Sequence, residues 1–183
     1  EYCDALKAEL WAQTYAGQQV RVEIERRDLR GGEKVWSWVK KGVPVRAEVG
    51  PRDVAQEAVF AARRDDGSKK SVPRAVFAAR VADTLKSIQD SLFARAKKYR
   101  DGNTVEISSK DDFYSFFTPK NAKKPEIHGG FAVAHYDGSR EVEEALKNDL
   151  KVTVRCIPLE GGGKGKCIFT GKEGIKAVFA KSY

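Results

Sequence analysis

The spacing of hydrophobic residues changes several times along the chain, and each spacing predicts a kind of element. Residues 20–24 and 43–49 alternate between apolar and polar positions, which is the pattern of a strand with one buried face. From Pro73 the spacing becomes helical, and residues 81–99 place apolar side chains every three or four positions, as one face of a long helix does. The first hundred residues therefore combine strands and helices.

Shorter signals complete this first region. Residues 3–14 have helical spacing and stop before Gly17, and residues 31–42 form a second helical stretch between glycines. Asp66-Gly67 is the signal of a tight hairpin turn between the extended stretches on either side of it. Because a helix that leads into a parallel strand normally follows another strand, we expect a mixed sheet packed against helices, with its first strand missing.

The remainder of the chain reads as a smaller α/β domain, which divides the chain into residues 1–103 and 104–183. Ser108 or Ser109 is placed to cap a short aromatic-rich helix, and residues 139–150 form a second helix. Strands are expected in "FAVAHYDG", "KVTVRCIPL" and on both sides of the Gly-Lys-Glu-Gly turn near the end. The segment "EGGGKGKC" is expected to be a flexible loop.

Charge narrows the possible partners. The 183 residues carry 34 Lys and Arg against 26 Asp and Glu, a formal net charge of +8, which favours RNA, DNA or acidic lipid. A lysine-rich surface on an ordinary soluble protein is the alternative. No run of about 18 apolar residues exists, so a membrane span is excluded, and no signal peptide is expected.

The cysteines predict the redox compartment of the protein, and the first residues predict that the chain is part of a longer one. Three cysteines are too few and odd in number for a disulfide framework, which indicates a reducing compartment. The chain contains no Met and opens directly inside a helical pattern, so we expect it to be part of a longer protein.

Arg52 and Asp53 are the first candidate site, because they follow an apolar strand and the rigid Gly50-Pro51 break. A neighbouring Arg-Asp pair is often only a surface ion pair of small energetic value. A carboxylate can also accept the two adjacent donors of the guanine Watson–Crick edge, while arginine can bind the guanine Hoogsteen acceptors, stack on the base or hold its phosphate. Proteins that read RNA act on such unpaired bases.

Basic residues around the hairpin turn form a second candidate. Lys69 and Lys70 follow the turn and Arg63 and Arg64 precede it, so they predict either a phosphate clamp or a solvated charged hairpin. Trp36 and Trp38 lie two positions apart on a short helix, so only one can point fully inward. The outward one is a candidate for base stacking.

No catalytic or metal site is predicted. His128 and His135 are the only histidines, and without a nucleophile motif or a metal-ligand pattern both are interpreted as structural. The loop "EGGGKGK" lacks the GxxxxGK[ST] spacing of a phosphate-binding loop, because Lys164 and Lys166 are followed by Gly165 and Cys167.

The segments "KKGVPVRAEVGPRD", "VFAARRDDGSKK" and "VTVRCIPLE" and the final "VFAKSY" resemble those of proline–tRNA ligases, in particular the archaeal/eukaryote-like form. The resemblance covers the whole chain. It implies a class II anticodon-binding domain without its first strand, followed by the C-terminal domain of that form. The catalytic domain, with its ATP and Mg, is absent, so no cofactor is expected here.

All proline anticodons end in two guanines, which agrees with the chemistry inferred for Arg52 and Asp53. By resemblance, the expected anticodon contacts are these two residues, Arg46, and Lys69 or Lys70. Val39 stands where the family often has Glu, three residues before the glycine of "KGVP", so the second guanine would be read by another group or more loosely.

The C-terminal domain of many relatives holds zinc with four cysteines in two close pairs. Here "HYDGSREVEE" contains no cysteine, Thr170 replaces the partner of Cys167, and Cys156 lies outside the expected pairs. Since structural zinc needs four ligands, we expect none, and an apolar core should hold the domain instead. The expected core residues are Val152, Val154, Ile168, Val178 and Phe179. Tyr183 is expected to lie on this domain or to be disordered.

Two hypotheses about function follow from these patterns. The chain is the tRNA-recognition part of a cytoplasmic proline–tRNA ligase, a parent enzyme expected to be a homodimer that binds proline tRNA and no membrane. Alternatively, it is a non-catalytic module that reuses the anticodon-binding fold to bind RNA or protein, which Val39 and the lost cysteines support.

Overall fold

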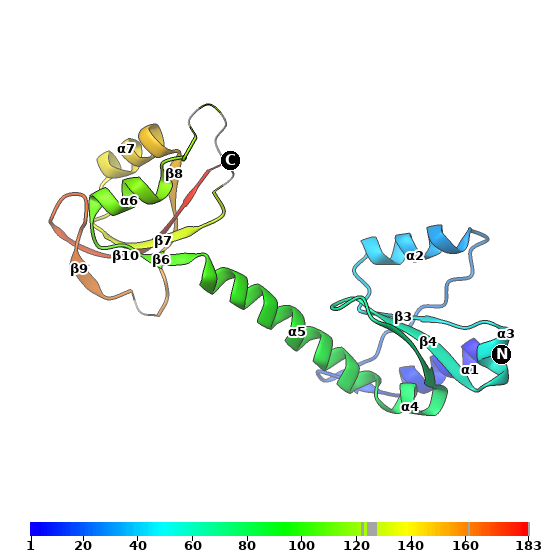
Figure 1. The fold of residues 1–183 in the computed structure, drawn as a ribbon. Coiled ribbons are helices and arrows are strands. Elements are labelled where there is room, and N and C mark those ends of the chain that lie inside the picture. Colours follow the sequence, from blue (N-terminus) through cyan, green and yellow to red (C-terminus); the bar gives the residue numbers. More distant parts are fainter. Residues whose placement is uncertain (122, 124–127, 161, 183) are drawn as a thin grey trace. The chain divides into compact units, whose positions relative to one another are not determined.

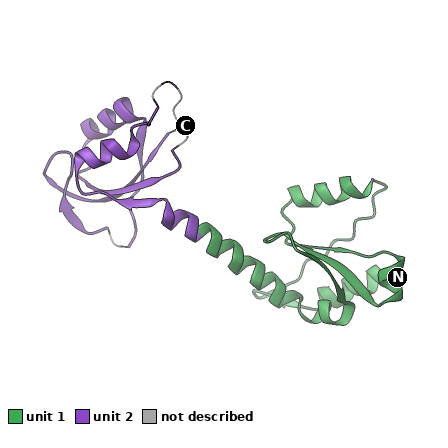
Figure 2. Cartoon of the chain, in the orientation of Figure 1, with its two compact units in different colours: residues 1–96 green, residues 97–183 purple. Residues whose placement is uncertain are grey.

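The computed structural model describes residues 1–121, 123, 128–160 and 162–182, and the chain divides into two compact units, residues 1–96 and 97–183 (Figures 1 and 2). The long helix α5 (Val81–Gly102) begins in unit 1 and ends in unit 2. The domain boundary predicted after residue 103 stays a prediction. Within the described ranges, none of the helices has the length and apolarity needed to cross a membrane.

Unit 1 is built on a three-stranded antiparallel sheet with the order β3-β4-β5. The central strand is buried on both faces, because Val59 and Ala61 point to one side and Ala58 and Ala62 to the other. The predicted strand at residues 43–49 and the predicted hairpin are confirmed, and Gly67 in the turn has a φ of +70°. The strands are β3 (Val45–Glu48), β4 (Ala58–Arg63) and β5 (Lys69–Pro73).

Helices lie on both sides of this sheet (Figure 1). Leu6 and Leu10 of the first helix, Phe77, and Val81 at the start of α5 pack with Val59 into one core. The helix α2 lies on the other side and contains no buried residue (Figure 1). The helices of unit 1 before α5 are α1 (Tyr2–Trp11), α2 (Gly31–Lys40), α3 (Pro51–Ala55) and α4 (Arg74–Ala79).

The strand expected at residues 20–24 is not formed. The described strands nearest in sequence are the two-residue β1 (Thr14–Tyr15) and β2 (Gln18–Gln19), which pair with each other. Val20, Val22 and Ile24 still alternate in burial with exposed Arg21 and Glu23. The side-chain alternation was therefore predicted correctly, but a strand also needs a neighbour for its backbone hydrogen bonds. No described strand pairs with this segment, so the sheet of unit 1 contains antiparallel pairs only.

The helix expected from Pro73 onward is interrupted once, because α4 ends at Ala79 and α5 begins at Val81. The predicted apolar stripe is buried only at the beginning of α5, where Val81 and Ile88 are 4% and 2% exposed. Tyr99, at the other end of the stripe, is 66% exposed. Hydrophobic spacing predicted the helix correctly but did not show how far the unit 1 core extends along it.

Unit 2 contains a mixed sheet with the order β6-β7-β10-β8, and β9 also pairs with β10. The β6–β7 pair is parallel and the other pairs are antiparallel. Two helices cover one face, and their side chains pack with alternate residues of β7 and β10. The elements are β6 (Thr104–Glu106), α6 (Lys110–Phe117), β7 (Phe131–Tyr136), α7 (Arg140–Leu150), β8 (Val152–Cys156), β9 (Lys164–Lys166) and β10 (Glu173–Lys181).

The core of unit 2 agrees largely with the prediction. Val152 and Phe179 are fully buried, and Val154 and Ile168 pack against the same cluster, whereas Val178 lies outside it. Ser109 caps α6, because its Oγ accepts a hydrogen bond from the backbone N–H of Asp112 at 3.1 Å. These local signals need only neighbouring residues, which explains why the sequence predicted them.

The loop predicted at residues 160–167 is partly wrong, because β9 lies inside it and forms a hairpin with β10. Gly165 sits in this strand against His135 of β7. A Cβ at position 165 would lie 2.3 Å from His135 Nε2, so any other residue here would require the His135 side chain to move. In the sequence, the glycine suggested a flexible loop. In the structure, Gly165 lets neighbouring parts of the sheet approach each other closely.

Candidate RNA-binding surface

The register of the unit 1 sheet brings two of the predicted site residues into one row. Arg46 on β3 and Lys69 on β5 both stand opposite Ala62 of the central strand. Residues directly opposite one another point to the same face, so Arg46 and Lys69 share a face. Lys70 stands opposite Ala61, on the face that carries the core. The sequence left Lys69 and Lys70 as alternatives, and the register favours Lys69.

The two cations of this row differ in their surroundings. The Arg46 side chain is 19% exposed, and its Nη1 lies 3.5 Å from Glu48 Oε1, two residues along the same strand face. Lys69 is exposed and makes no ion pair within the described part of the chain. A half-buried arginine has a fixed position, whereas an exposed lysine can follow a phosphate.

Arg64 extends the same face toward α2. It follows Ala62 by two residues and its backbone N–H donates to the Pro44 carbonyl at 3.0 Å. Its guanidinium carbon would lie 3.6 Å from a Cβ placed on Gly42, just after α2 ends. Arg64 is exposed, so it adds a cation where α2 meets the sheet.

Arg63 does not belong to this surface. Its Nε and Nη2 donate to the two carboxylate oxygens of Asp65 at 3.0 and 2.9 Å, and Nη2 also donates to Ser87 Oγ at 3.1 Å. The Asp65 side chain is buried, and the hydrogen bonds from Arg63 lower the pKa of Asp65 to about 2. The four basic residues predicted around the turn therefore divide into one buried ion pair and three exposed cations.

Arg52 and Asp53 stand in a one-turn helix and not directly on the end of a strand. Pro51 opens α3, and Asp53 Oδ2 accepts a hydrogen bond from the Gly50 N–H at 2.9 Å, which caps the helix. Asp53 Oδ1 makes no hydrogen bond to the described residues, and Arg52 is exposed. The two side chains form no ion pair with each other, so one carboxylate oxygen and the guanidinium remain available for a ligand.

The two tryptophans of α2 have different surroundings, as their spacing predicted. Trp38 is half-buried, its Nε1 donates to Glu25 Oε2 at 2.9 Å, and Lys41 Nζ lies 4.1 Å from its ring centroid. Glu25 is also held by Arg27, whose side-chain hydrogen bond lowers the pKa of Glu25 to about 2. Trp36 is 64% exposed.

Sequence reasoning missed the contribution of Lys40 to this surface and gave Arg64 no role separate from Arg63. Both are exposed and form no ion pair within the described ranges. The signals were present, since Lys40 adjoins the Gly42 helix end and Arg64 is two residues from Ala62. Assigning Arg64 to the Arg46 face required the register, because only the register shows which side each strand residue takes.

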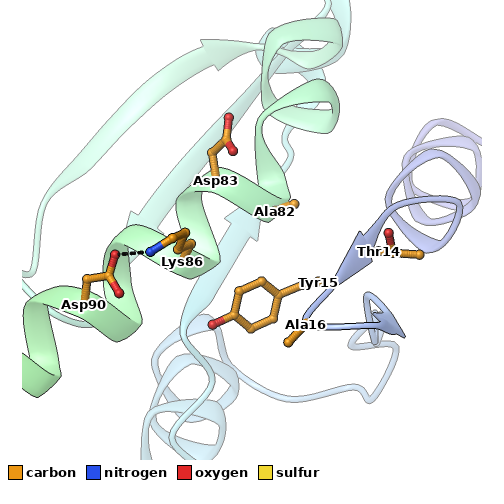
Figure 3. A pocket seen from close by; sticks show the side chains of 7 residues that line it. All are labelled: Thr14, Tyr15, Ala16, Ala82, Asp83, Lys86 and Asp90. Carbon is orange, nitrogen blue, oxygen red and sulfur yellow. Dashed lines mark hydrogen bonds and ion pairs between the residues drawn. The ribbon is translucent and has the colours of Figure 1, made fainter.

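A hollow of unit 1 lies elsewhere. It has a volume of about 420 Å³ between the β1–β2 hairpin and α5, and Lys86 Nζ pairs with Asp90 Oδ2 at 2.7 Å on its wall (Figure 3). Two of its lining side chains are carboxylates, which repel phosphate. It contains none of the predicted site residues. The lining residues are Thr14, Tyr15, Ala16, Ala82, Asp83, Lys86 and Asp90.

The positions that the resemblance assigns to zinc carry a hydrogen bond. Thr170 Oγ1 donates to Asp137 Oδ2 at 2.6 Å, and the Ser139 N–H donates to Asp137 Oδ1 at 3.1 Å. Cys167 is buried and has no second thiol beside it. Among the described residues, no three His, Cys, Asp or Glu side chains converge. This donor set does not fit a four-ligand zinc site.

The histidines have structural surroundings. His128 packs its ring against Phe116 and Phe117, with centroid distances of 4.7 and 5.1 Å. His135 stands on β7 against Gly165. Tyr183, for which the sequence gave an expectation, lies outside the described residues.

Comparisons with known proteins cover most of the chain. Residues 1–84 match a family model described as the anticodon binding domain, and residues 121–183 match one described as the prolyl-tRNA synthetase C-terminal domain. The chain is 53% identical to proline–tRNA ligase 2 of Anaeromyxobacter dehalogenans and 48% identical to the proline–tRNA ligase of Protochlamydia amoebophila. All of this chain aligns in both cases, but it spans only 37% of each relative.

A solved structure has the same fold. The crystal structure of prolyl-tRNA synthetase from Cryptosporidium parvum, complexed with L-proline and AMP, superposes with a TM-score of 0.73 at 24% identity, over all of this chain and 36% of that one. The curated relatives named above are bacterial, so they do not bear out the expected likeness to the archaeal/eukaryote-like form. The expected fold class is confirmed. Residues 1–84 therefore belong to the anticodon-binding domain family and residues 121–183 to the prolyl-tRNA synthetase C-terminal domain family, and the whole chain is similar to the C-terminal part of proline–tRNA ligases.

Proposed function

We propose that unit 1 binds the anticodon of proline tRNA, with Arg46, Arg52, Asp53 and Lys69 as contacts and Lys70 in a lesser role. The observation that carries the proposal is the state of Arg52 and Asp53. They are neighbours on an accessible helical turn, they are not paired with each other, and Asp53 keeps one free carboxylate oxygen.

The chemistry of guanine fits this arrangement. Its Watson–Crick edge offers two adjacent N–H donors, which a fixed carboxylate can accept in an unpaired base. The Gly50 N–H holds the Asp53 carboxylate in place, so less orientational freedom is lost on binding. The exposed cations Arg52, Arg64 and Lys69 supply the attraction for the RNA backbone.

The activity of the longer protein is part of the same proposal. A proline–tRNA ligase attaches proline to its tRNA at the expense of ATP, and ATP and Mg would bind a catalytic domain outside these 183 residues. We place that parent enzyme in the cytoplasm as a homodimer. Unit 2 would work without zinc, because the Asp137–Thr170 hydrogen bond occupies the expected ligand positions.

The test compares two tRNAs that differ only in the anticodon. The 183-residue chain should bind a proline tRNA transcript more tightly than the same transcript with both anticodon guanines replaced. Asp53→Ala should cost about 1–3 kcal/mol of binding free energy, mostly against the guanine-containing tRNA. Equal affinity of the unchanged chain for both transcripts would contradict the proposal.

A matched control separates recognition from helix capping, because Asp53 does both. Asp53→Asn keeps an oxygen that can accept from the Gly50 N–H but cannot present a carboxylate to guanine. It should lose the base preference while its thermal unfolding midpoint stays close to that of the unchanged chain. A preserved base preference in Asp53→Asn would remove the assigned role.

The second candidate is a non-catalytic module that binds RNA or protein loosely. Val39 supports it, because it is 41% exposed beside the candidate surface and offers no hydrogen bond to a base. The sequence before residue 1 discriminates the two, since an intact class II catalytic domain there would establish the ligase and its absence would favour the module.

A further inference from the structure

The outward side of α2 carries an apolar ridge without a partner among the described residues. Trp36 and Val39 are 64% and 41% exposed and stand three positions apart, so they are neighbours on one helix face. The other tryptophan of the helix, Trp38, is held by Glu25 and Lys41 on the inner side. These contacts account for Trp38, whereas Trp36 has no comparable contact among the described residues.

Two cations lie at the C-terminal end of this ridge. Lys40 stands four positions after Trp36 on the same face, and it is exposed and forms no ion pair within the described part of the chain. Arg64 lies beside Gly42, just beyond the end of the helix. The only carboxylate of α2 is Glu33, which stands three positions before Trp36 on the same face and seven positions before Lys40.

A flat aromatic ring next to an unpaired cation matches the two parts of a nucleotide. The ring can stack on any base, because every base has a π face, and the cation can hold the neighbouring phosphate. A second protein surface would complete the apolar contact but would leave Lys40 unneutralised unless it was acidic. Charge complementarity thus favours single-stranded RNA as the occupant.

We propose that Trp36 is a stacking platform for an unpaired base of the bound RNA and that Lys40 holds the phosphate beside it. The platform rests on the proposed RNA-binding function and adds a contact that is independent of base identity. It is separate from the guanine contact at Arg52 and Asp53, which lie on α3. Its effect should therefore be similar for native and anticodon-replaced tRNA.

The experiment measures binding of the full 183-residue chain to the proline tRNA transcript. Base stacking on an aromatic side chain predicts that Trp36→Ala raises the dissociation constant roughly 5- to 150-fold for both transcripts. Trp36→Phe should have a clearly smaller effect, because it keeps a ring. Trp11→Ala is the matched control, since Trp11 is 44% exposed on α1 and should leave the affinity unchanged.

Each outcome decides between the two proposals. If Trp36→Ala binds tRNA like the unchanged chain while Asp53→Asn loses its base preference, the platform is wrong and the anticodon proposal stands. If the unchanged chain binds neither transcript, both are wrong. If Trp36→Ala abolishes self-association in sedimentation velocity without altering tRNA affinity, the ridge is a protein interface and the platform is again wrong.

A folding control accompanies these measurements. Trp36 is largely exposed, so Trp36→Ala should unfold within a few degrees of the unchanged chain. Lys40→Ala should reduce the slope of log affinity against log salt by about 0.7, the value for one phosphate contact on a single strand. An unchanged slope would remove the phosphate part of the proposal.

Discussion

The two units place their aromatic residues in opposite ways. In unit 2, Phe113, Phe117 and Phe179 are fully buried, and the Phe113 ring lies 5.0 and 5.1 Å from the other two. In unit 1 the core consists mainly of aliphatic and alanine side chains, and Trp36 points outward. Aromatic burial supplies much of the stability of a small domain, so unit 2 uses its rings for folding. Unit 1 leaves several rings exposed, among them Trp11, Trp36 and Phe93.

Both units contain ion pairs, but three cations on the candidate surface of unit 1 are unpaired within the described residues. In unit 2, Lys176 pairs with Glu106 and Lys164 pairs with Glu173, both at 2.8 Å. In unit 1, Lys40, Arg64 and Lys69 form no ion pair with the described residues. Exposed ion pairs contribute little to stability, so the difference between paired and unpaired cations chiefly affects the binding of charged partners. Unpaired cations keep their attraction for phosphate.

The largest test of this comparison is the removal of an aromatic ring from unit 2. Phe113→Ala should lower the free energy of unfolding by about 3–5 kcal/mol, because Phe113 is fully buried between other rings. Binding of tRNA by unit 1 should be preserved. Urea unfolding and tRNA titration of the full chain measure both quantities.

The exposed Phe93 provides the control for this change. It is 64% exposed, so Phe93→Ala should stay within about 0.5 kcal/mol of the unchanged chain. At temperatures where unit 2 alone is unfolded, Phe113→Ala should still bind tRNA. Loss of binding there would show that tRNA binding depends on a folded unit 2 and is not a property of unit 1 alone.

A smaller change should follow acidification of unit 1. The hydrogen bonds from Arg63 lower the pKa of Asp65 from 3.8 to about 2, so the folded state favours the carboxylate form. This stabilisation is present above pH 3.8 and is lost as the pH falls toward 2. Urea midpoints measured across that range should fall in the unchanged chain, and Asp65→Asn should remove this part of the decrease. Identical pH profiles would contradict the assignment.

The hydrogen bond at the expected zinc position of unit 2 should have a modest effect. Thr170→Val removes the donor to Asp137 at nearly the same volume and should cost about 0.5–1.5 kcal/mol of unfolding free energy. EDTA should leave the unfolding midpoint of the unchanged chain where it is. A decrease with EDTA, reversed by zinc, would show that a metal holds this unit.

The smallest expected effect concerns the two lysines after the hairpin turn. Lys69→Ala should reduce the slope of log tRNA affinity against log salt by about 0.7–0.9, because Lys69 shares a face with Arg46. Lys70→Ala should change it by less than half as much. Thermal stability should be the same in both variants. Equal slopes would mean that the sheet face does not decide which lysine meets the RNA.

Much of the fold was visible in the sequence because its signals are local. Hydrophobic spacing predicted α2, α5, α7 and the central hairpin, and Asp66-Gly67 identified the turn. The predictions that failed are those that depend on which other segment lies beside a strand. Residues 20–24 have strand alternation but pair with no described strand, and the glycines at 161–165 suggested a loop although Gly165 lies in β9. A side-chain pattern does not specify which segment will supply the backbone hydrogen bonds.

By itself, the sequence determined the candidate residues, because Arg52, Asp53, Lys69 and the paired tryptophans are recognisable by residue type and spacing. Only the tertiary structure decided how each one is presented. The strand register put Lys69 and Arg64 on the Arg46 face, the ion pair with Asp65 removed Arg63, and the Gly50 N–H bound one oxygen of Asp53. The physical reason is that a charge attracts a ligand only where no nearby group already neutralises it, and the folded backbone decides which face and which neighbour each side chain takes.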